Sequence, residues 1–271
     1  MVRPMSSRPP ARLDRLRQRR RGSKTAAAAY VAELEKCGCD ASKAILADKA
    51  YLTKKSFWIF GGDGWAYDIG FGGLDHVLAS GHNVNVFVFD TEVYSNTGGQ
   101  ASKASNLGQV AQFAAAGKVT KKKSLAEIAM SYGYVYVAQV AMGANRLRPS
   151  RPSTRPSLRR PVPHHRLQPL RDALHQEGRH AELPGRDEEA VECGYWNLFR
   201  FNPEAAAGKK FSLDSKEPAG GYQEFLMNEA RYASLTRSFP ERAEELFKEN
   251  EQAAMDRYAH LLKLKTVYNE A

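Results

Sequence analysis

The chain lacks long apolar runs. Its 271 residues contain no stretch of 18 or more consecutive apolar side chains, which excludes a predicted transmembrane helix. The N-terminus carries arginines without an apolar stretch behind them, so it does not have the pattern of a secretory signal peptide. We therefore expect a cytoplasmic protein that has no membrane partner.

Cysteine is also scarce, and its spacing excludes a disulfide scaffold. The chain holds three cysteines, Cys37, Cys39 and Cys193, with no CxxC pair among them. Cys37 and Cys39 could indicate a metal site. Since no further Cys or His follows at ligand spacing, we expect ordinary thiols in a reducing compartment.

Lysine is absent from two segments that are otherwise strongly basic. Residues 1–21 hold eight Arg and one Asp, and residues 146–186 hold ten Arg, seven Pro and four His against three acidic residues. Each segment contributes a charge of +7 to a formal net charge of +10, so the remainder of the chain carries −4. The body of the protein is therefore mildly acidic.

These two segments allow three interpretations. They could be basic arms for nucleic acid or a membrane surface, a disordered linker, or stretches translated out of frame. Neither shows an apolar period of 2 or 3.6, and seven prolines argue against a long helix or a central strand in the second segment. We favour the third interpretation, because a shifted frame in GC-rich DNA yields Arg, Pro, Ala and Ser but little Lys. The lack of interleaved aromatics argues against a nucleic-acid partner.

The rest of the chain predicts alternating strands and helices. Short apolar runs predict buried strands, and patterns near 3.6 with Gly or Ser at their ends predict helices. The predicted strands are 56–60, 84–89 and 134–140, and the predicted helices are 24–52 (broken at Gly38), 67–79, 124–132, 188–201, 221–237 and 240–268. This order predicts an α/β fold, with a mainly parallel sheet covered by helices and further helices at the C-terminus.

Oxygen-bearing side chains and glycines follow the first two predicted strands. Asp63 lies in Gly61-Gly62-Asp63-Gly64, and Thr91 begins Thr91-Glu92-Val93-Tyr94-Ser95-Asn96-Thr97-Gly98-Gly99, 28 residues later. In parallel sheets, ligands bind at the carboxyl ends of strands. The Asp63 carboxylate, the Thr91 hydroxyl and the Val93 carbonyl could bind magnesium, whose remaining ligands would be two diphosphate oxygens and a water. Each motif alone is also an ordinary turn sequence.

The same residues carry a resemblance to a known family. Residues 58–70 and 90–103 resemble the thiamine-diphosphate domain of the pyruvate:ferredoxin (flavodoxin) oxidoreductases. Further stretches that resemble it are 113–118, 132–145, 190–196 and 213–218. The resemblance runs over about 22–145 and again from 188 to the end.

The resemblance implies a role for each motif residue. Asp63, Thr91 and the Val93 carbonyl would hold Mg²⁺, and Asn96, the catalytic residue, would lie beside the thiazolium and the bound pyruvate. The diphosphate would be lined by four residues: Gly62, Gly64, Trp65 and Thr97. The implied reaction is oxidative decarboxylation of pyruvate to acetyl-CoA with coenzyme A, with electrons passed through [4Fe-4S] clusters to ferredoxin or flavodoxin. The implied parent enzyme is a homodimer.

The chain departs from the family in length and in cysteine content. The family's pyrimidine-activating glutamate, pyruvate-binding arginine and cluster domain are absent, and residues 146–186 contain no cysteine. We expect a fragment that is inactive alone, with residues 1–21 and 146–187 disordered and out of frame. Residues 22–145 would form the thiamine-diphosphate domain, and residues 188–271 a helical extension packed on it. The alternatives are a non-catalytic binding subunit or docking module of a split 2-oxoacid oxidoreductase, and a basic-arm nucleic-acid binder.

Overall fold

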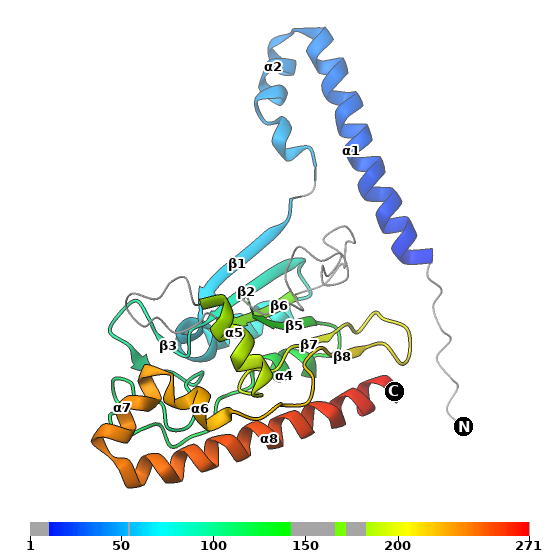
Figure 1. Ribbon diagram of the computed structural model, residues 1–271. Helices are drawn as coiled ribbons and strands as arrows, with labels where there is room; N and C mark the ends of the chain where they lie inside the picture. Colours follow the sequence, from blue (N-terminus) through cyan, green and yellow to red (C-terminus); the bar gives the residue numbers. More distant parts are fainter. Residues whose placement is uncertain (1–10, 54, 142–165, 172–182, 271) are drawn as a thin grey trace. The chain divides into compact units, whose positions relative to one another are not determined.

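The computed structural model describes residues 11–53, 55–141, 166–171 and 183–270 (Figure 1). The chain divides into two compact units, residues 1–57 with 156–163 and residues 58–155 with 164–271. In the described residues, no helix is both long and apolar enough to cross a membrane.

The first unit is helical. It contains α1 (Ala11–Cys37), α2 (Asp40–Ala47) and the 3₁₀ turn η1 (Lys49–Tyr51). Gly38, with a φ of 63°, ends α1 as the sequence predicted. However, α1 also covers residues 11–21, which we expected to be disordered. The physical reason is that all three prolines of this segment precede Ala11, and Arg, Leu and Gln are good helix formers.

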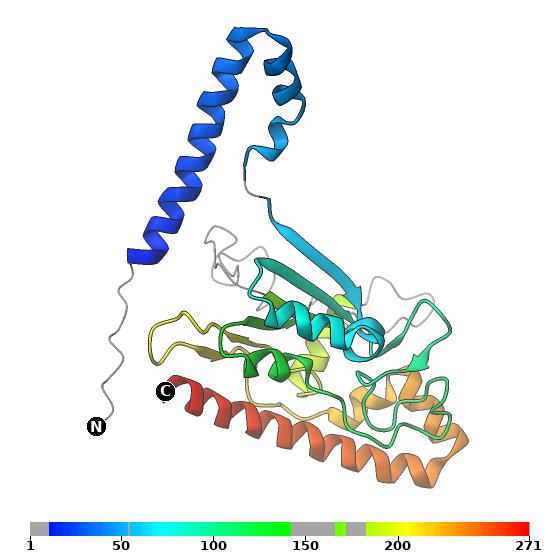
Figure 2. The ribbon, with the colours of Figure 1, turned by 180° about the vertical axis from the view of Figure 1, so that it is seen from behind.

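The second unit is built on a six-stranded sheet (Figure 2). Its strands follow the order β1 (Phe57–Gly62), β2 (Val84–Asp90), β6 (Arg166–Arg171), β5 (Tyr136–Ala141), β7 (Phe199–Phe201) and β8 (Phe211–Leu213). The central strands β2, β6 and β5 run parallel, whereas β7 and β8 join by antiparallel pairing. The predicted α/β fold with a mainly parallel sheet is confirmed.

Strand β6 lies where the sequence argued against a strand, inside the segment 146–187 that we expected to be disordered. It pairs with β2 along its whole length, Pro169 facing Val88. Its pairing with β5 is interrupted at Gln168 and Pro169 and resumes at Leu170. A proline removes only one ladder donor, so a short strand can keep its remaining pairs on both sides.

Two apolar cores hold this unit together. In the first, α3 (Phe71–Ala79) and α4 (Leu125–Ser131) pack on β2, β5, β7 and β8, joined by Leu261. The second joins α5 (Leu183–Glu192), α6 (Tyr222–Met227), α7 (Ala230–Ser238) and the first half of α8 (Pro240–Glu270). The long helix α8, drawn in orange and red in Figure 1, contributes residues to both cores.

Three expected elements differ from the structure. The predicted helix 188–201 ends at Glu192, and its last residues form β7, where Phe199 and Phe201 are both buried. The predicted helix 221–237 is two helices, α6 and α7. The predicted buried strand β1 is an edge strand in which Phe57 and Phe60 are 63% and 61% exposed. An apolar run cannot tell a central strand from an edge strand.

Candidate active site

The first predicted site residue sits at the junction of a strand and a helix. Asp63 follows β1 directly and precedes a π-helical turn, η2 (Gly64–Ile69). A π-helical turn is rare in proteins and is often found at functional sites. The Asp63 side chain is completely buried at this junction.

The structure brings the three predicted metal ligands together. The Thr91 hydroxyl, at the end of β2, lies 2.9 Å from Asp63 Oδ1 and 3.1 Å from the Val93 carbonyl oxygen. The Thr91 backbone N–H also donates to Asp63 Oδ1, at 3.2 Å. The second carboxylate oxygen of Asp63 accepts a 2.7 Å hydrogen bond from Ser102. Strand ends 28 residues apart therefore form one cluster of oxygen atoms.

The Thr91 hydroxyl has more acceptors within reach than it has hydrogen atoms. The single hydroxyl hydrogen of Thr91 faces both Asp63 Oδ1 and the Val93 carbonyl, and Ser95 Oγ lies 2.6 Å from the same hydroxyl. In the described part of the chain, Asp63 forms no ion pair. Since buried carboxylates are normally paired or bind a metal, this hard-oxygen set fits a magnesium ion.

Burial also changes the acidity of Asp63. Removal from water, and next the neighbouring carboxylate of Asp90, raise the pKa of Asp63 to about 6, against the lowering effect of the Ser102 hydrogen bond. Asp90 is itself buried, and burial raises its pKa as well. The ionised forms of Asp63 and Asp90 are therefore unfavourable at this end of the sheet unless a cation lies nearby.

The glycines of the first motif have different surroundings. A Cβ at Gly62 would meet nothing within 4 Å, so the space beside this residue is open. A Cβ at Gly64 would lie 2.5 Å from the Tyr94 ring, and one at Gly61 would lie 2.3 Å from the Trp65 ring. The absence of a side chain at Gly64 therefore makes room for the Tyr94 ring, and of these three glycines Gly62 is the one with open space where a side chain would stand.

The remaining predicted residues lie on a small hairpin. Strands β3 (Val93–Tyr94) and β4 (Gln100–Ala101) pair in antiparallel fashion around a turn that includes Asn96 and Thr97. Both of these side chains are exposed, and the Thr97 hydroxyl bonds to Gln100. The turn follows the cluster of Asp63, Thr91 and Val93 directly along the chain.

Sequence analysis missed a buried polar network behind this cluster. Glu92, which is 1% exposed, accepts hydrogen bonds from Tyr195 at 2.7 Å, from Asn106 at 3.2 Å and from Gln109. Lys122 joins it from the other side, 2.8 Å from Asp90 Oδ1 and 3.5 Å from Glu92 Oε1. The run Lys121-Lys122-Lys123 was visible in the sequence, but nothing there showed that its middle member is turned inward.

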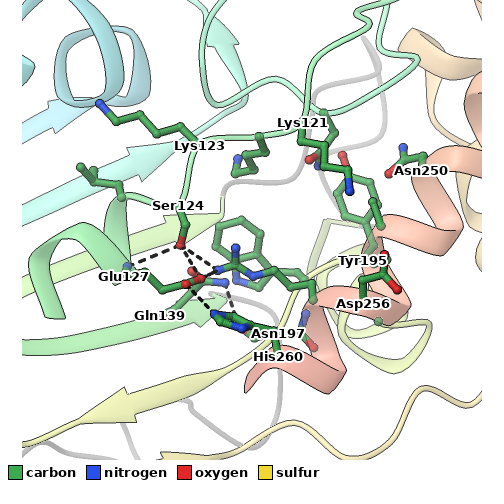
Figure 3. Close-up of a pocket in the computed structure, with 18 of the residues that line it drawn as sticks. Lys121, Lys123, Ser124, Glu127, Gln139, Tyr195, Asn197, Asn250, Asp256 and His260 are labelled. Carbon is green, nitrogen blue, oxygen red and sulfur yellow. Dashed lines mark hydrogen bonds and ion pairs between the residues drawn. The ribbon is translucent and has the colours of Figure 1, made fainter. Parts of the chain in front are cut away.

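A cavity of about 340 Å³ lies beside this network, where α4 and α8 approach each other (Figure 3). Ser124, Glu127 and His260 are hydrogen-bonded along one of its walls. Lys122 and Tyr195 also line it, so the network separates this cavity from the oxygen cluster. None of the predicted site residues is among its lining residues.

The described residues contain no group of three or more His, Cys, Asp and Glu side chains that could hold a metal. The predicted magnesium set has a single carboxylate, so its use as a metal site stays a prediction. Cys37 and Cys39 are exposed, with their sulfur atoms 3.1 Å apart, and Cys193 is buried. With three cysteines, the chain alone cannot supply the four thiolates of a [4Fe-4S] cluster.

The chain is similar to known proteins over most of its length. Residues 22–152 match the family "Thiamine pyrophosphate enzyme, C-terminal TPP binding domain". The chain is 53% identical over 227 residues to the pyruvate:ferredoxin oxidoreductase of Moorella thermoacetica, covering 80% of this chain and 18% of that one. It is 48% identical over 235 residues to the pyruvate-flavodoxin oxidoreductase of Klebsiella pneumoniae, covering 85% and 20%. An Enterobacter agglomerans pyruvate-flavodoxin oxidoreductase is 52% identical over 219 residues, covering 79% and 18%.

The chain therefore spans about a fifth of the length of these relatives. Within that span, the identity is high and includes the thiamine-binding domain. The chain belongs to the pyruvate:ferredoxin (flavodoxin) oxidoreductase family of enzymes.

Proposed function

We propose that this chain provides the magnesium–thiamine diphosphate site of a pyruvate:ferredoxin oxidoreductase. The observation that supports it is that the Thr91 hydroxyl contacts both Asp63 Oδ1 and the Val93 carbonyl, while the buried Asp63 carboxylate forms no ion pair among the described residues. These three oxygens are half of the six that Mg²⁺ prefers, which leaves room for diphosphate oxygens and water.

Each predicted residue then has a binding role. Asp63, Thr91 and Val93 would hold the metal, and Ser102 would orient the Asp63 carboxylate as a partner behind the ligands. The exposed Asn96 would hydrogen-bond to the reacting end of the substrate. The diphosphate would lie along Gly62, Gly64, Trp65 and Thr97.

The bound cofactor would supply an electron sink for the charge that remains when a 2-oxo acid loses carbon dioxide. The residues of this chain would anchor the diphosphate and keep water from the buried carboxylate. For the whole protein, we propose oxidation of pyruvate to acetyl-CoA with coenzyme A, with ferredoxin or flavodoxin as electron acceptor. The cluster ligands must come from outside this chain, which we expect to be inactive alone. The homodimer and the cytoplasmic setting stay predictions.

The relatives named above are oxidoreductases, so the nucleic-acid and docking alternatives gain no support from them. Binding of thiamine diphosphate to the purified chain, measured by calorimetry with and without Mg²⁺, tests the proposal. We expect binding that requires Mg²⁺ and that weakens at least roughly 100-fold in Asp63→Asn, because a direct ligand outweighs the 10–100-fold effect of a second-layer partner.

A matched control is Asp214→Asn. Its carboxylate is 15% exposed, whereas that of Asp63 is completely buried. It follows β8 directly and forms an ion pair with Arg200 of β7, away from the site. It should lose stability without losing affinity. Binding by Asp63→Asn as tight as by the unmodified chain would refute the proposed site.

A further inference from the structure

The backbone of Glu92 is in an unusual conformation. Its φ is 64°, in the left-handed region that side chains with a Cβ rarely adopt. Glu92 stands between Thr91 and Val93, two of the proposed metal ligands. The reversed turn at Glu92 places the Thr91 hydroxyl 3.1 Å from the Val93 carbonyl, so both face Asp63. The left-handed backbone of Glu92 is therefore part of the local geometry in which the Thr91 hydroxyl contacts both Asp63 and the Val93 carbonyl.

The Glu92 side chain is anchored on the side away from the metal ligands. Tyr195, Gln109 and Asn106 donate hydrogen bonds to its carboxylate, and Lys122 lies 3.5 Å from Oε1. Its own carbonyl accepts a hydrogen bond from the Ser105 hydroxyl. A buried side chain held by several donors can stabilise a backbone conformation that would otherwise be unfavourable.

This anchor reaches the C-terminal helices. The Tyr195 hydroxyl lies 2.8 Å from the Tyr232 hydroxyl of α7, which accepts from Asn250 of α8 at 3.3 Å. From α7, Arg231 also donates directly to the Thr91 carbonyl, at 3.2 Å. The loop that carries the proposed ligands is therefore bonded to helices more than 100 residues away in the sequence.

We infer that Glu92 is a positioning residue, which holds Thr91 and Val93 in their ligand geometry through the buried bonds to Tyr195 and the C-terminal helices. The inference rests on the proposed function for its purpose. The hydrogen bonds that hold Glu92 are all made by residues of this chain. Glu92 would contact neither metal nor cofactor.

Hydrogen exchange of the full chain without ligand tests the positioning directly. The Thr91 amide, which donates to Asp63 Oδ1, reports the loop geometry. Glu92→Gln keeps the size of the side chain but places an amide donor against other donors, which are Tyr195 and Gln109 on one side and Asn106 and Lys122 on the other. We expect Thr91 to exchange at least about tenfold faster, because the loop opens locally while α3 keeps its protection.

Two further variants separate positioning from general destabilisation. Glu127→Gln removes the charge of a different glutamate, whose side chain is 26% exposed and which pairs with Arg257 and His260 on α8. It should leave exchange at Thr91 unchanged. Tyr195→Phe removes one bond to Glu92 without altering the loop sequence, and should give a smaller increase than Glu92→Gln. It serves as the test if Glu92→Gln does not fold. The inference is overturned if the Thr91 amide exchanges at the same rate in Glu92→Gln as in the unmodified chain. If Glu92→Gln does not fold, the same result in Tyr195→Phe overturns it.

Ligand binding provides a second readout. If the chain binds thiamine diphosphate, the Mg²⁺ concentration for half-saturation should rise about tenfold in Glu92→Gln and stay unchanged in Glu127→Gln. Equal Mg²⁺ dependence in all three proteins would contradict the positioning role. If the unmodified chain binds no thiamine diphosphate at all, the proposed function fails, while the exchange experiment still decides the role of Glu92.

Discussion

Replacing Lys122 with methionine should be among the most damaging single changes in the second unit. Its ammonium group lies 2.8 Å from Asp90 Oδ1, 3.5 Å from Glu92 Oε1 and 2.7 Å from the Ala104 carbonyl. Asp90 and Glu92 are buried, and the Lys122 side chain is only 18% exposed. Lys122→Met keeps most of the aliphatic chain but leaves two buried carboxylates beside an apolar group.

The magnitude follows from the asymmetry of buried ion pairs. Removing one partner of such a pair costs about 3–5 kcal/mol, because the remaining charge stays buried without compensation. Loss of the contact with the Trp196 ring, 5.3 Å from the ammonium, would add about 0.5–1 kcal/mol. We expect the total to take a large part of the stability of a typical domain, which is about 5–15 kcal/mol.

Urea denaturation at neutral pH measures this loss, provided that the slope of the transition stays the same. The matched control is Lys103→Met, whose ion pair with Asp68 is at the surface, with the lysine 65% exposed. That change should cost about 0–1 kcal/mol. A cost for Lys122→Met no larger than for Lys103→Met would refute the argument that Lys122 compensates buried charge.

Two further predictions concern the first motif and α8. Gly64→Ala should lower the free energy of unfolding by about 1–3 kcal/mol in thermal or urea unfolding, because its Cβ would press on the Tyr94 ring. Gly62→Ala should change the free energy of unfolding by under about 0.5 kcal/mol but weaken thiamine diphosphate binding. Equal effects of the two changes on stability would contradict the packing. Burial raises the pKa of Glu127, but Arg257 and two side-chain hydrogen bonds hold it below its ordinary value of 4.5. Glu127→Gln should therefore cost about 1–2 kcal/mol at pH 7, and the deficit should shrink as pH falls below about 4.5, since protonation removes the wild-type advantage. A deficit that does not change with pH would exclude an electrostatic origin.

The position of the oxygen cluster could be predicted because it depends on local pattern. Apolar runs ending at Phe60 and Phe89 predict strands, and Asp63 and Thr91 follow their carboxyl ends. Parallel strands bring those ends to one edge of the sheet whatever the loops do. The Val93 carbonyl lies only two residues after Thr91, although the left-handed backbone of Glu92 that turns it toward Thr91 was not predicted. The ends of both strands depend on neighbouring residues, so the local apolar pattern is enough to predict them.

The buried network could not be predicted, because its partners are far apart in the chain. Glu92 and Tyr195 are separated by 103 residues, and Asn250 and the Leu107 carbonyl by 143. No periodicity relates such positions. The exposure of β1 was hidden for the same reason: only the strand order shows that it is an edge strand. For β6, the rule against proline in a central strand was too strong, since one missing donor leaves the other ladder bonds intact.

The charges near the cluster explain why its geometry can exist before a ligand binds. Three buried carboxylates, Asp63, Asp90 and Glu92, lie in this region. Lys122 contacts Asp90 and Glu92. Burial lowers the pKa of Arg231, and the negative charge of Glu92 partly raises it again. Hydroxyl and amide groups, in contrast, are the described partners of Asp63. Among the described residues, Asp63 is thus the one of these three carboxylates whose direct contacts are all uncharged groups, although the more distant charge of Lys122 lowers its pKa. A divalent cation at this point would complete the balance, and its excess positive charge would attract a diphosphate, so metal and cofactor should bind to this chain together rather than separately.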